Sequence, residues 1–201
     1  MKKLIIVGIP SYNEEKTIGF VTQQIDAGLR KFFPHFNCYL INIDSNSEDK
    51  TVEKFLNTKT FFPKIFIKPR GLIKGKGKNL LSLFRYSLKL GGDFVAIFDS
   101  DLKSITPDWI GKLLSPLIYE DYNYVVPLYC RSCYDGNVTN HFIYPLTYAL
   151  FRTKLRQPIG GEFSLDKKFY SFIVIACNAR FDAKGWINFF SNQISVNNWC
   201  K

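Results

Sequence analysis

Two aspartates one residue apart, Asp99 and Asp101, are the residues of this chain whose types and spacing most directly suggest chemistry. They follow the apolar residues 94–98, which we expect to form a buried strand. Paired carboxylates at a strand exit offer the hard oxygen ligands that Mg²⁺ or Mn²⁺ prefers, and such an ion can bridge the protein to a diphosphate. Alone the Asp-x-Asp triplet is weak evidence, because it also occurs in solvated turns and helix caps.

A second candidate is the run Lys-Gly-Lys-Gly-Lys at residues 74–78, which includes Lys74 and Lys76. Lysines neutralise phosphate oxygens, and glycines allow close backbone approach to a phosphate. A flexible, solvated basic loop is the alternative interpretation. The spacing does not fit the Gly-x4-Gly-Lys-Ser/Thr phosphate loop, which argues against ATP hydrolysis of that type.

These residues need elements that bring them together, and the chain alternates apolar runs with helical patterns. Apolar runs at residues 4–9, 38–43, 64–68 and 94–98 are typical of buried parallel strands. Helical spacing of apolar residues follows each of the first three, in Ile18, Val21, Ile25 and Leu29, in Val52 and Phe55, and over residues 79–90. The alternation predicts an α/β fold, with a mainly parallel open sheet and helices on both faces.

Ligands of such sheets bind beyond the carboxyl ends of the strands. The polar clusters of this chain fall at those ends, so we expect one rim of the sheet to gather Asp44, Lys74, Lys76, Asp99 and Asp101. A rim that combines lysines, glycines and an acid pair suits a nucleoside diphosphate bound with a divalent cation.

Taken in order, four motifs resemble the nucleotide-sugar half of a GT-A glycosyltransferase of the family 2 type: Pro10-Ser11-Tyr12-Asn13-Glu14, Asp44-Ser45, Gly75-Lys76-Gly77 and Asp99-Ser100-Asp101-Leu102. Residues 134–140, 144–147 and 156–162 resemble the narrower group that contains mannosylglycerate synthase and glucosyl-3-phosphoglycerate synthase. The resemblance covers about residues 3 to 170 and implies a GT-A (Rossmann-like) fold.

The resemblance also implies roles for individual residues. Nucleotide-sugar contacts would come from Pro10, Tyr12, Glu14, Asp44, Ser45, Lys76, Asp99 and Ser100. Among these, Asp44 would bind the edge of the base and Lys76 the diphosphate, while Asp99 and Asp101 would hold Mg²⁺ or Mn²⁺. The residues expected to act in catalysis are Asp101, Lys76 and Glu162.

On the acceptor side, the resemblance implies a small acidic acceptor, such as glycerate or phosphoglycerate, bound by Arg131, Asp135, Thr139, Gln157 and Gly161. An arginine that is common in the phosphoglycerate enzymes is replaced here by Asn137, which weakens the case for a phosphorylated acceptor. Taken without the resemblance, Asp135-Gly136 and Gly160-Gly161 read as ordinary turns.

The expected reaction is transfer of a hexose from a UDP- or GDP-sugar, and the resemblance favours retention. An inverting enzyme would need a general base, for which Glu162 is the candidate. Two alternatives stay open: a catalytically impaired or fragmentary protein that only binds the nucleotide sugar, and a sugar nucleotidyltransferase. No glycine-rich, arginine-bearing triphosphate loop follows the first strand, which counts against the second alternative.

Composition agrees with a protein that binds acidic ligands. The chain has 201 residues, 27 basic and 17 acidic side chains and a net charge of +10, and we expect no nucleic-acid partner because no such binding motif is present. Peripheral membrane association and homodimerisation are further expectations. The five cysteines are dispersed apart from Cys130 and Cys133, which lack a second pair for zinc, so we expect reduced thiols and a cytoplasmic location.

The chain is expected to divide into a GT-A domain at residues 1–172 and a divergent or truncated tail at residues 173–201, which would leave the fold incomplete at its carboxyl end. Related enzymes supply a further metal-ligating histidine from a later segment. Neither His35 nor His141 stands in that place.

Overall fold

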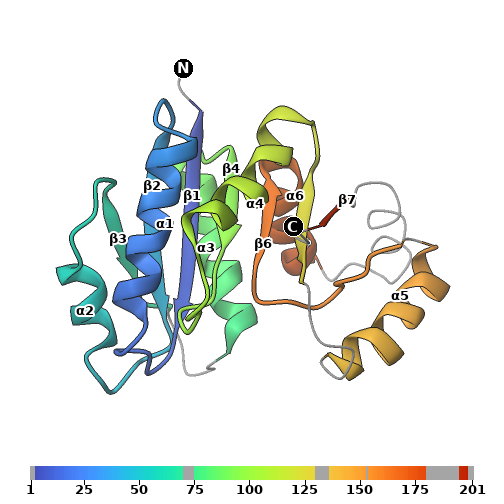
Figure 1. Ribbon diagram of the computed structural model, residues 1–201, viewed down its shortest axis with the longest axis horizontal. Helices are drawn as coiled ribbons and strands as arrows, with labels where there is room; N and C mark the ends of the chain where they lie inside the picture. The colour runs from blue at the N-terminus through green and yellow to red at the C-terminus, as the bar shows by residue number, and fades with distance from the viewer. Residues whose placement is uncertain (1–2, 70–74, 130–135, 153, 180–194, 199–201) are drawn as a thin grey trace.

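The computed structural model describes residues 3–69, 75–129, 136–152, 154–179 and 195–198, which build one mixed sheet with helices on both faces (Figure 1). The strands are β1 (Leu4–Ser11), β2 (Asn37–Asp44), β3 (Lys64–Ile67), β4 (Phe94–Ile97), β5 (Tyr124–Leu128), β6 (Phe163–Asp166) and β7 (Ser195–Asn198). The helices are α1 (Ile18–Phe32), α2 (Thr51–Asn57), α3 (Lys76–Leu90), α4 (Pro107–Tyr119), a π-helical segment η1 (Val138–Ile143), α5 (Tyr144–Phe151) and α6 (Lys167–Ala179).

The strand order is β3-β2-β1-β4-β6-β5-β7. The first four strands pair in parallel, with β1 between β2 and β4, and these are the four strands predicted from the apolar runs. The predicted α/β class, a mainly parallel open sheet with helices on both faces, is therefore confirmed. Strand β6 runs antiparallel to both β4 and β5, an insertion that the sequence patterns did not predict.

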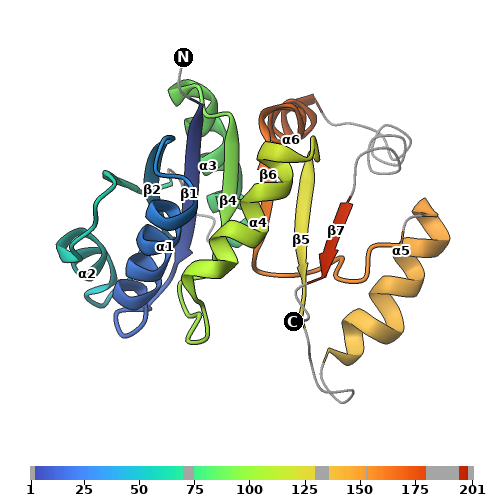
Figure 2. The ribbon, with the colours of Figure 1, turned by 45° about the horizontal axis from the view of Figure 1, so that its top comes forward.

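Each face of the sheet has its own apolar core, because alternate residues of a strand point to opposite faces. From β1, Ile5, Val7 and Ile9 pack under α1 and α4, whereas Ile6 packs under α3 and α6. Figure 2 shows these two helix pairs on opposite sides of the strands. The central strands are buried on both faces, which explains why they are apolar at almost every position.

Helix α3 starts earlier than predicted, at Lys76 rather than at residue 79. Gly75 precedes it with φ +151°, a backbone conformation open to glycine and strained for other residues. The Gly75 carbonyl then accepts from the N–H groups of Lys78 and Asn79, which closes the first turn. The lysines at 76 and 78 therefore lie on a helix and not in a loop.

At the other end of the sheet, η1 and α5 extend from the body of the molecule (Figures 1 and 2). Helix α6 continues through residue 172, where the tail of the chain was expected to begin. None of the helices in the described part of the chain is long and apolar enough to cross a membrane.

Candidate functional site

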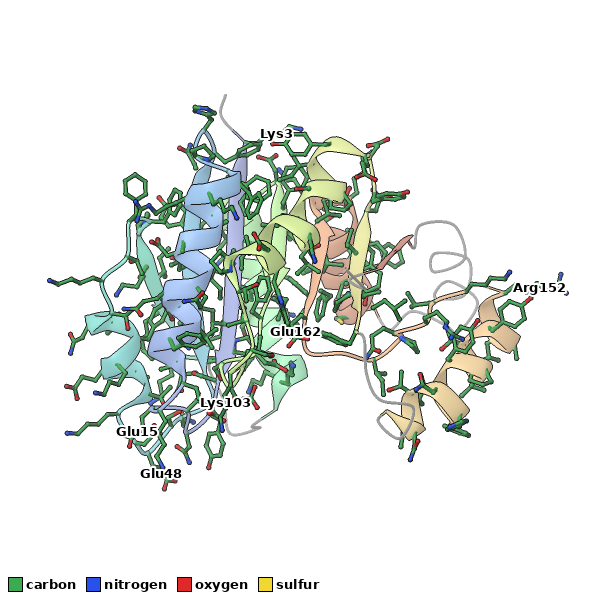
Figure 3. All side chains as sticks on the ribbon, viewed as in Figure 1. Lys3, Glu15, Glu48, Lys103, Arg152 and Glu162 are labelled. Atoms are coloured by element: carbon green, nitrogen blue, oxygen red, sulfur yellow. The ribbon has the colours of Figure 1, made fainter. Side chains whose placement is uncertain are left out.

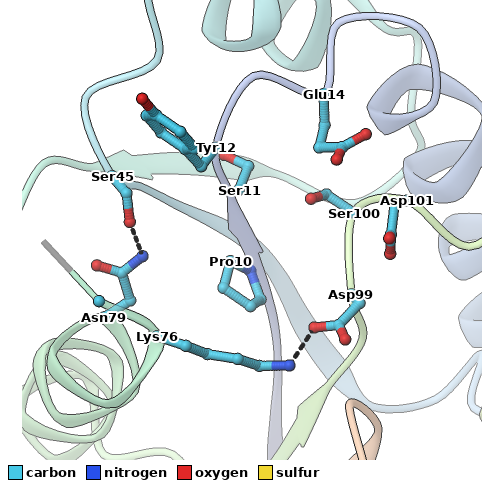
Figure 4. A pocket seen from close by; sticks show the side chains of 11 residues that line it. Pro10, Ser11, Tyr12, Glu14, Ser45, Lys76, Asn79, Asp99, Ser100 and Asp101 are labelled. Atoms are coloured by element: carbon cyan, nitrogen blue, oxygen red, sulfur yellow. Dashed lines mark hydrogen bonds and ion pairs between the residues drawn. The ribbon is translucent and has the colours of Figure 1, made fainter.

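A cavity of about 500 Å³ opens at the carboxyl ends of β1, β2 and β4, beside the start of α3 (Figure 4). It is lined by Pro10, Ser11, Tyr12, Glu14, Ser45, Gly75, Lys76, Asn79, Asp99, Ser100 and Asp101. We call it the rim pocket. Residues separated by up to 91 positions in the sequence thus meet in one pocket, at the place where an open α/β sheet binds its ligands.

The charged residues of the rim pocket lie at the exit of β4 and on the first turn of α3. The Lys76 ammonium pairs with Asp99, with 2.5 Å between Nζ and Oδ1, and both side chains stay partly open to solvent. Asp101 is exposed and lines the same pocket. The acid pair and its lysine, which belong to two separate sequence motifs, are therefore brought together.

The two carboxylates fit part of a ligand set for a hard divalent cation. Asp99 and Asp101 leave the same strand end and both reach the rim pocket, where water and phosphate oxygens could complete the coordination. Within the described ranges, no cluster of three His, Cys, Asp or Glu side chains could hold a metal ion. Two carboxylates leave coordination positions of an ion such as Mg²⁺ for water and for oxygens of a ligand.

The start of α3 adds a second attraction for an anion. The first N–H groups of any helix lack partners within the helix, and the helix dipole places partial positive charge there. In this chain that end carries Lys76 and is preceded by Gly75, and both residues line the rim pocket. This part of the pocket is chemically suited to phosphate oxygens.

Asp44 is buried and is not among the residues that line the rim pocket. Its carboxylate, only 3% exposed, accepts hydrogen bonds from Ser11 Oγ at 3.0 Å and from the Ser47 backbone N–H at 2.7 Å. The Ser47 hydroxyl donates to it as well. Contact between Asp44 and a base stays a prediction, and in this conformation Ser45 presents its side chain to the pocket instead.

The wall formed by the exit of β1 is held by hydrogen bonds to the exit of β2. Asn13 adopts φ +55°, donates its backbone N–H to Ser47 Oγ at 2.9 Å and accepts from the Glu48 N–H at 2.9 Å. The Glu14 N–H donates to Thr51 Oγ1 at 2.7 Å. Tyr12 belongs to the same β1 exit, is 46% exposed and lines the pocket (Figure 4).

Gly161 and Glu162 approach the same acid pair from the segment before β6. Glu162 is buried within the molecule, whereas Lys3 and Arg152 lie at its periphery (Figure 3). Burial, together with the nearby Asp99 carboxylate, raises the pKa of Glu162 from 4.5 to about 7, although the Lys76 ammonium acts in the opposite direction. The structure thus brings Glu162 beside the charged residues of the rim pocket, as the sequence motifs suggested.

Of the other residues predicted to bind the acceptor, the structure describes two, Thr139 and Gln157. Thr139 on η1 and Gln157 are both buried and do not line the rim pocket, and the Gln157 amide donates to the Ile159 carbonyl at 2.6 Å. The predictions for Arg131 and Asp135 lie outside the described residues, as do those for Lys74 and for the pair Cys130 and Cys133.

Three residues that line the rim pocket were not predicted as site residues: Ser11 and Gly75, which lie within the quoted motifs, and Asn79, which lies outside them. Asn79 lies one helical turn after Lys76, so a helix that starts at Lys76 places both side chains on one face. The spacing of three residues between Lys76 and Asn79 would have predicted a shared helix face, but only if the start of the helix had been known.

The open, mainly parallel sheet, with a pocket of carboxylates and a lysine at its strand ends, defines the GT-A (Rossmann-like) class of α/β folds. The model of the family described as "Glycosyl transferase family 2" matches residues 6–178, and the chain belongs to this family.

Among curated proteins, the chain is similar to two glucosyl-3-phosphoglycerate synthases. The one from Petrotoga mobilis is 33% identical over 175 residues, which cover 80% of this chain and 52% of that protein. The one from Mycolicibacterium smegmatis is 31% identical over 182 residues, which cover 81% and 56%. The chain therefore spans about half the length of the curated relatives it matches, and the resemblance to this group is confirmed.

Among solved structures, the fold is similar to the glucosyl-3-phosphoglycerate synthase of Mycobacterium tuberculosis. The complex of that enzyme with Mg²⁺ and UDP has a TM-score of 0.70 at 23% identity, over 98% of this chain and 69% of that one. Its complex with Mn²⁺, UDP-glucose and phosphoglyceric acid has a TM-score of 0.68 at 26% identity, over 98% and 70%.

Proposed function

We propose that this chain is the nucleotide-sugar-binding part of a metal-dependent glycosyltransferase, which moves a hexose from a nucleoside-diphosphate sugar to a small acidic acceptor of the phosphoglycerate type. The observation that carries the proposal is the meeting of Lys76, Asp99 and Asp101 in one pocket at the start of α3. The two synthases, about one third identical over four fifths of this chain, support the acceptor class, and the solved complexes of a related enzyme support UDP as the nucleotide.

Each part of the rim pocket has a role in this proposal. Pro10, Tyr12, Glu14 and Ser45 would hold the base and the ribose, with the exposed Tyr12 ring stacked on the base. Lys76 and the N–H groups at the start of α3 would neutralise the diphosphate, with Ser100 at the far side of the pocket.

Asp99 and Asp101 would hold Mg²⁺ or Mn²⁺, which when bound supplies positive charge that stabilises the departing diphosphate. Lys76, which pairs with Asp99, would stabilise the same developing charge. On the acceptor side, Thr139, Gln157 and Gly161, together with Arg131 and Asp135, are the proposed contacts.

In the proposed reaction, the bond between the anomeric carbon and the phosphate oxygen breaks. A bond forms from the anomeric carbon to the acceptor hydroxyl oxygen, and the hydroxyl proton leaves with the nucleoside diphosphate. We propose retention of configuration, in which no side chain has to act as base on the face opposite the leaving group. If the product is inverted, Glu162 is the candidate base, and the anomeric coupling constant of the product in a proton NMR spectrum distinguishes the two outcomes.

The test combines binding and turnover. Calorimetry with UDP and with GDP, each with and without Mn²⁺, should show binding of one nucleotide that strengthens when Mn²⁺ is added. UDP-glucose should then be incubated with phosphoglycerate, with glycerate or with no acceptor. At least one of the two acceptors should make the release of UDP faster than it is without an acceptor. Absence of binding to both nucleotides with Mn²⁺ present would overturn the proposal.

A binding function without turnover is the second candidate. It is favoured because two of the predicted acceptor residues, Thr139 and Gln157, are buried and do not line the rim pocket. Metal-dependent UDP binding without release of UDP from UDP-glucose would support this function. Membrane association, homodimerisation and a cytoplasmic location stay predictions from the sequence.

A further inference from the structure

A buried amide joins two parts of the rim pocket. Asn79 is 4% exposed, and its Nδ2 donates to Ser45 Oγ at 2.7 Å and to the Ile43 carbonyl at 3.3 Å (Figure 4). These bonds connect the first turn of α3 to the exit of β2. Because the Ile43 carbonyl can only accept, the amide nitrogen has to face β2, which settles the orientation of the side chain.

The bond to Ser45 determines what that serine can offer a ligand. The Ser45 backbone is already held at the exit of β1, since its N–H donates to the Ser11 carbonyl at 2.9 Å. Its Oγ accepts from Asn79, so the hydroxyl proton is available to donate to an acceptor atom in the pocket. Without the amide, the Ser45 hydroxyl would lose this hydrogen bond, which restrains its orientation.

The same amide restrains the position of Lys76. The two residues are three positions apart on α3, so their side chains share one face of the helix. Movement of the first turn away from β2 would carry Lys76 out of the pocket and would break both bonds of the Asn79 amide. A buried amide that loses its partners is unfavourable, and this resists the movement.

We propose that Asn79 is a positioning residue that keeps the side chains of Ser45 and Lys76 in fixed positions relative to each other. Ser45 can then bind the nucleoside end of a nucleoside diphosphate while Lys76 binds its diphosphate end. The identity of the ligand rests on the proposed function. The coupling between Asn79, Ser45 and Lys76 rests on the hydrogen bonds of the folded chain.

A double-mutant cycle on UDP binding, measured by calorimetry with Mn²⁺, tests the coupling to Ser45. Asn79→Ala and Ser45→Ala should each weaken UDP binding about 10-fold, and the double variant should be no more than about twofold weaker than the worse single variant. If the loss in the double variant equals the product of the two single losses, the residues act independently and the inference is wrong.

Pyrophosphate tests the coupling to Lys76, because it lacks the base and ribose that would contact Ser45. Asn79→Ala should weaken pyrophosphate binding several-fold, whereas Ser45→Ala should leave it unchanged. The matched control is Ser87→Ala, which also removes a buried polar group from α3 but lies outside the rim pocket. Unchanged pyrophosphate affinity in Asn79→Ala would overturn this half of the proposal.

Asn79→Asp guards against a purely structural explanation. The substitution preserves the shape of the side chain but removes the donor that faces Ile43 and Ser45. A variant that keeps the thermal midpoint within a few degrees of the wild type and still loses affinity for UDP supports positioning. Retained UDP affinity in a folded Asn79→Asp protein contradicts it.

Failure of the proposed function is a separate outcome. It follows if the wild type binds neither UDP nor GDP, whereas additive losses in the double-mutant cycle contradict only the role of Asn79.

Discussion

The backbone of Gly161 lies directly against the carboxylate of Asp99. A Cβ atom at position 161 would overlap Asp99 Oδ2 and would stand 2.7 Å from its Cγ. A side chain at position 161 would force the Asp99 carboxylate to shift, away from its ion pair with Lys76. The segment before β6 can therefore pack closely against the exit of β4 because Gly161 has no side chain.

Gly161→Ala should weaken UDP binding in the presence of Mn²⁺ at least about 10-fold, because displacement of Asp99 disturbs both the ion pair and the proposed metal ligand. Calorimetry with UDP and Mn²⁺ measures the effect. Gly160→Ala is the matched control, since the nearest atom to its new Cβ is 3.8 Å away, which is ordinary contact. Equal affinities for the two variants would show that Asp99 tolerates the displacement.

Asp101→Asn should remove the Mn²⁺-dependent part of UDP binding and leave the metal-free part within about twofold. The amide keeps the shape of the side chain but loses the negative charge that a hard cation requires. Titrations of UDP with Mn²⁺ and with EDTA measure the two parts. Asp108→Asn is a control in the first turn of α4, where Asp108 forms an exposed ion pair with Lys31 outside the rim pocket, and should change neither. A full response to Mn²⁺ in Asp101→Asn would show that the metal is held elsewhere.

Lys76→Gln should weaken binding of UDP about 10- to 100-fold while leaving the affinity for uridine unchanged, because the lost ammonium is proposed to contact only the diphosphate. Competition between a fluorescent UDP analogue and each unlabelled ligand gives both affinities. Lys89→Gln, at the exposed end of the same helix, removes the same charge without touching the pocket. Loss of uridine binding in Lys76→Gln would mean that the substitution disturbs the whole pocket.

Glu162 should make the metal-free protein more stable at low pH. Its pKa is about 7 in the folded chain against an ordinary value of 4.5. Below pH 4.5 the group is protonated in both states. Between pH 4.5 and 7 it ionises in the unfolded chain first, so the free energy of unfolding falls by up to about 3 kcal/mol and then levels off above pH 7.

Urea unfolding in EDTA from pH 4.5 to 8 measures this effect as the difference between the wild type and Glu162→Gln. The glutamine variant lacks the ionisation and supplies the reference for all other titrating groups. The difference should decline as the pH rises to 7 and stay constant above it. A difference that does not change with pH would mean that the Glu162 carboxylate is as well solvated in the folded chain as in the unfolded one.

The parallel half of the fold was predictable because its signals are local. Each of its strands is a continuous apolar run, and each polar cluster follows such a run directly. The antiparallel strand β6 gave no comparable signal. Strand β6 contains four residues, Phe163–Asp166, and is held in the sheet by neighbours β4 and β5 rather than by any pattern of its own.

The site shows the same division. Lys76, Asp99 and Asp101 could be assigned to one rim, because parallel strands end at the same edge of a sheet. The inward position of Asp44 could not be assigned, because it depends on a hydrogen bond from Ser11 that forms only when the ends of β1 and β2 lie side by side.

Residue types and their order along the chain are enough to establish an α/β domain with acids and a lysine at its strand ends, since apolar periodicity and strand polarity are local properties of the sequence. The contact of Gly161 with Asp99 and the amide bonds of Asn79 join residues 62 and 34 to 36 positions apart. Such contacts depend on packing at distances of a few ångströms, which becomes defined when the helices and the sheet come together.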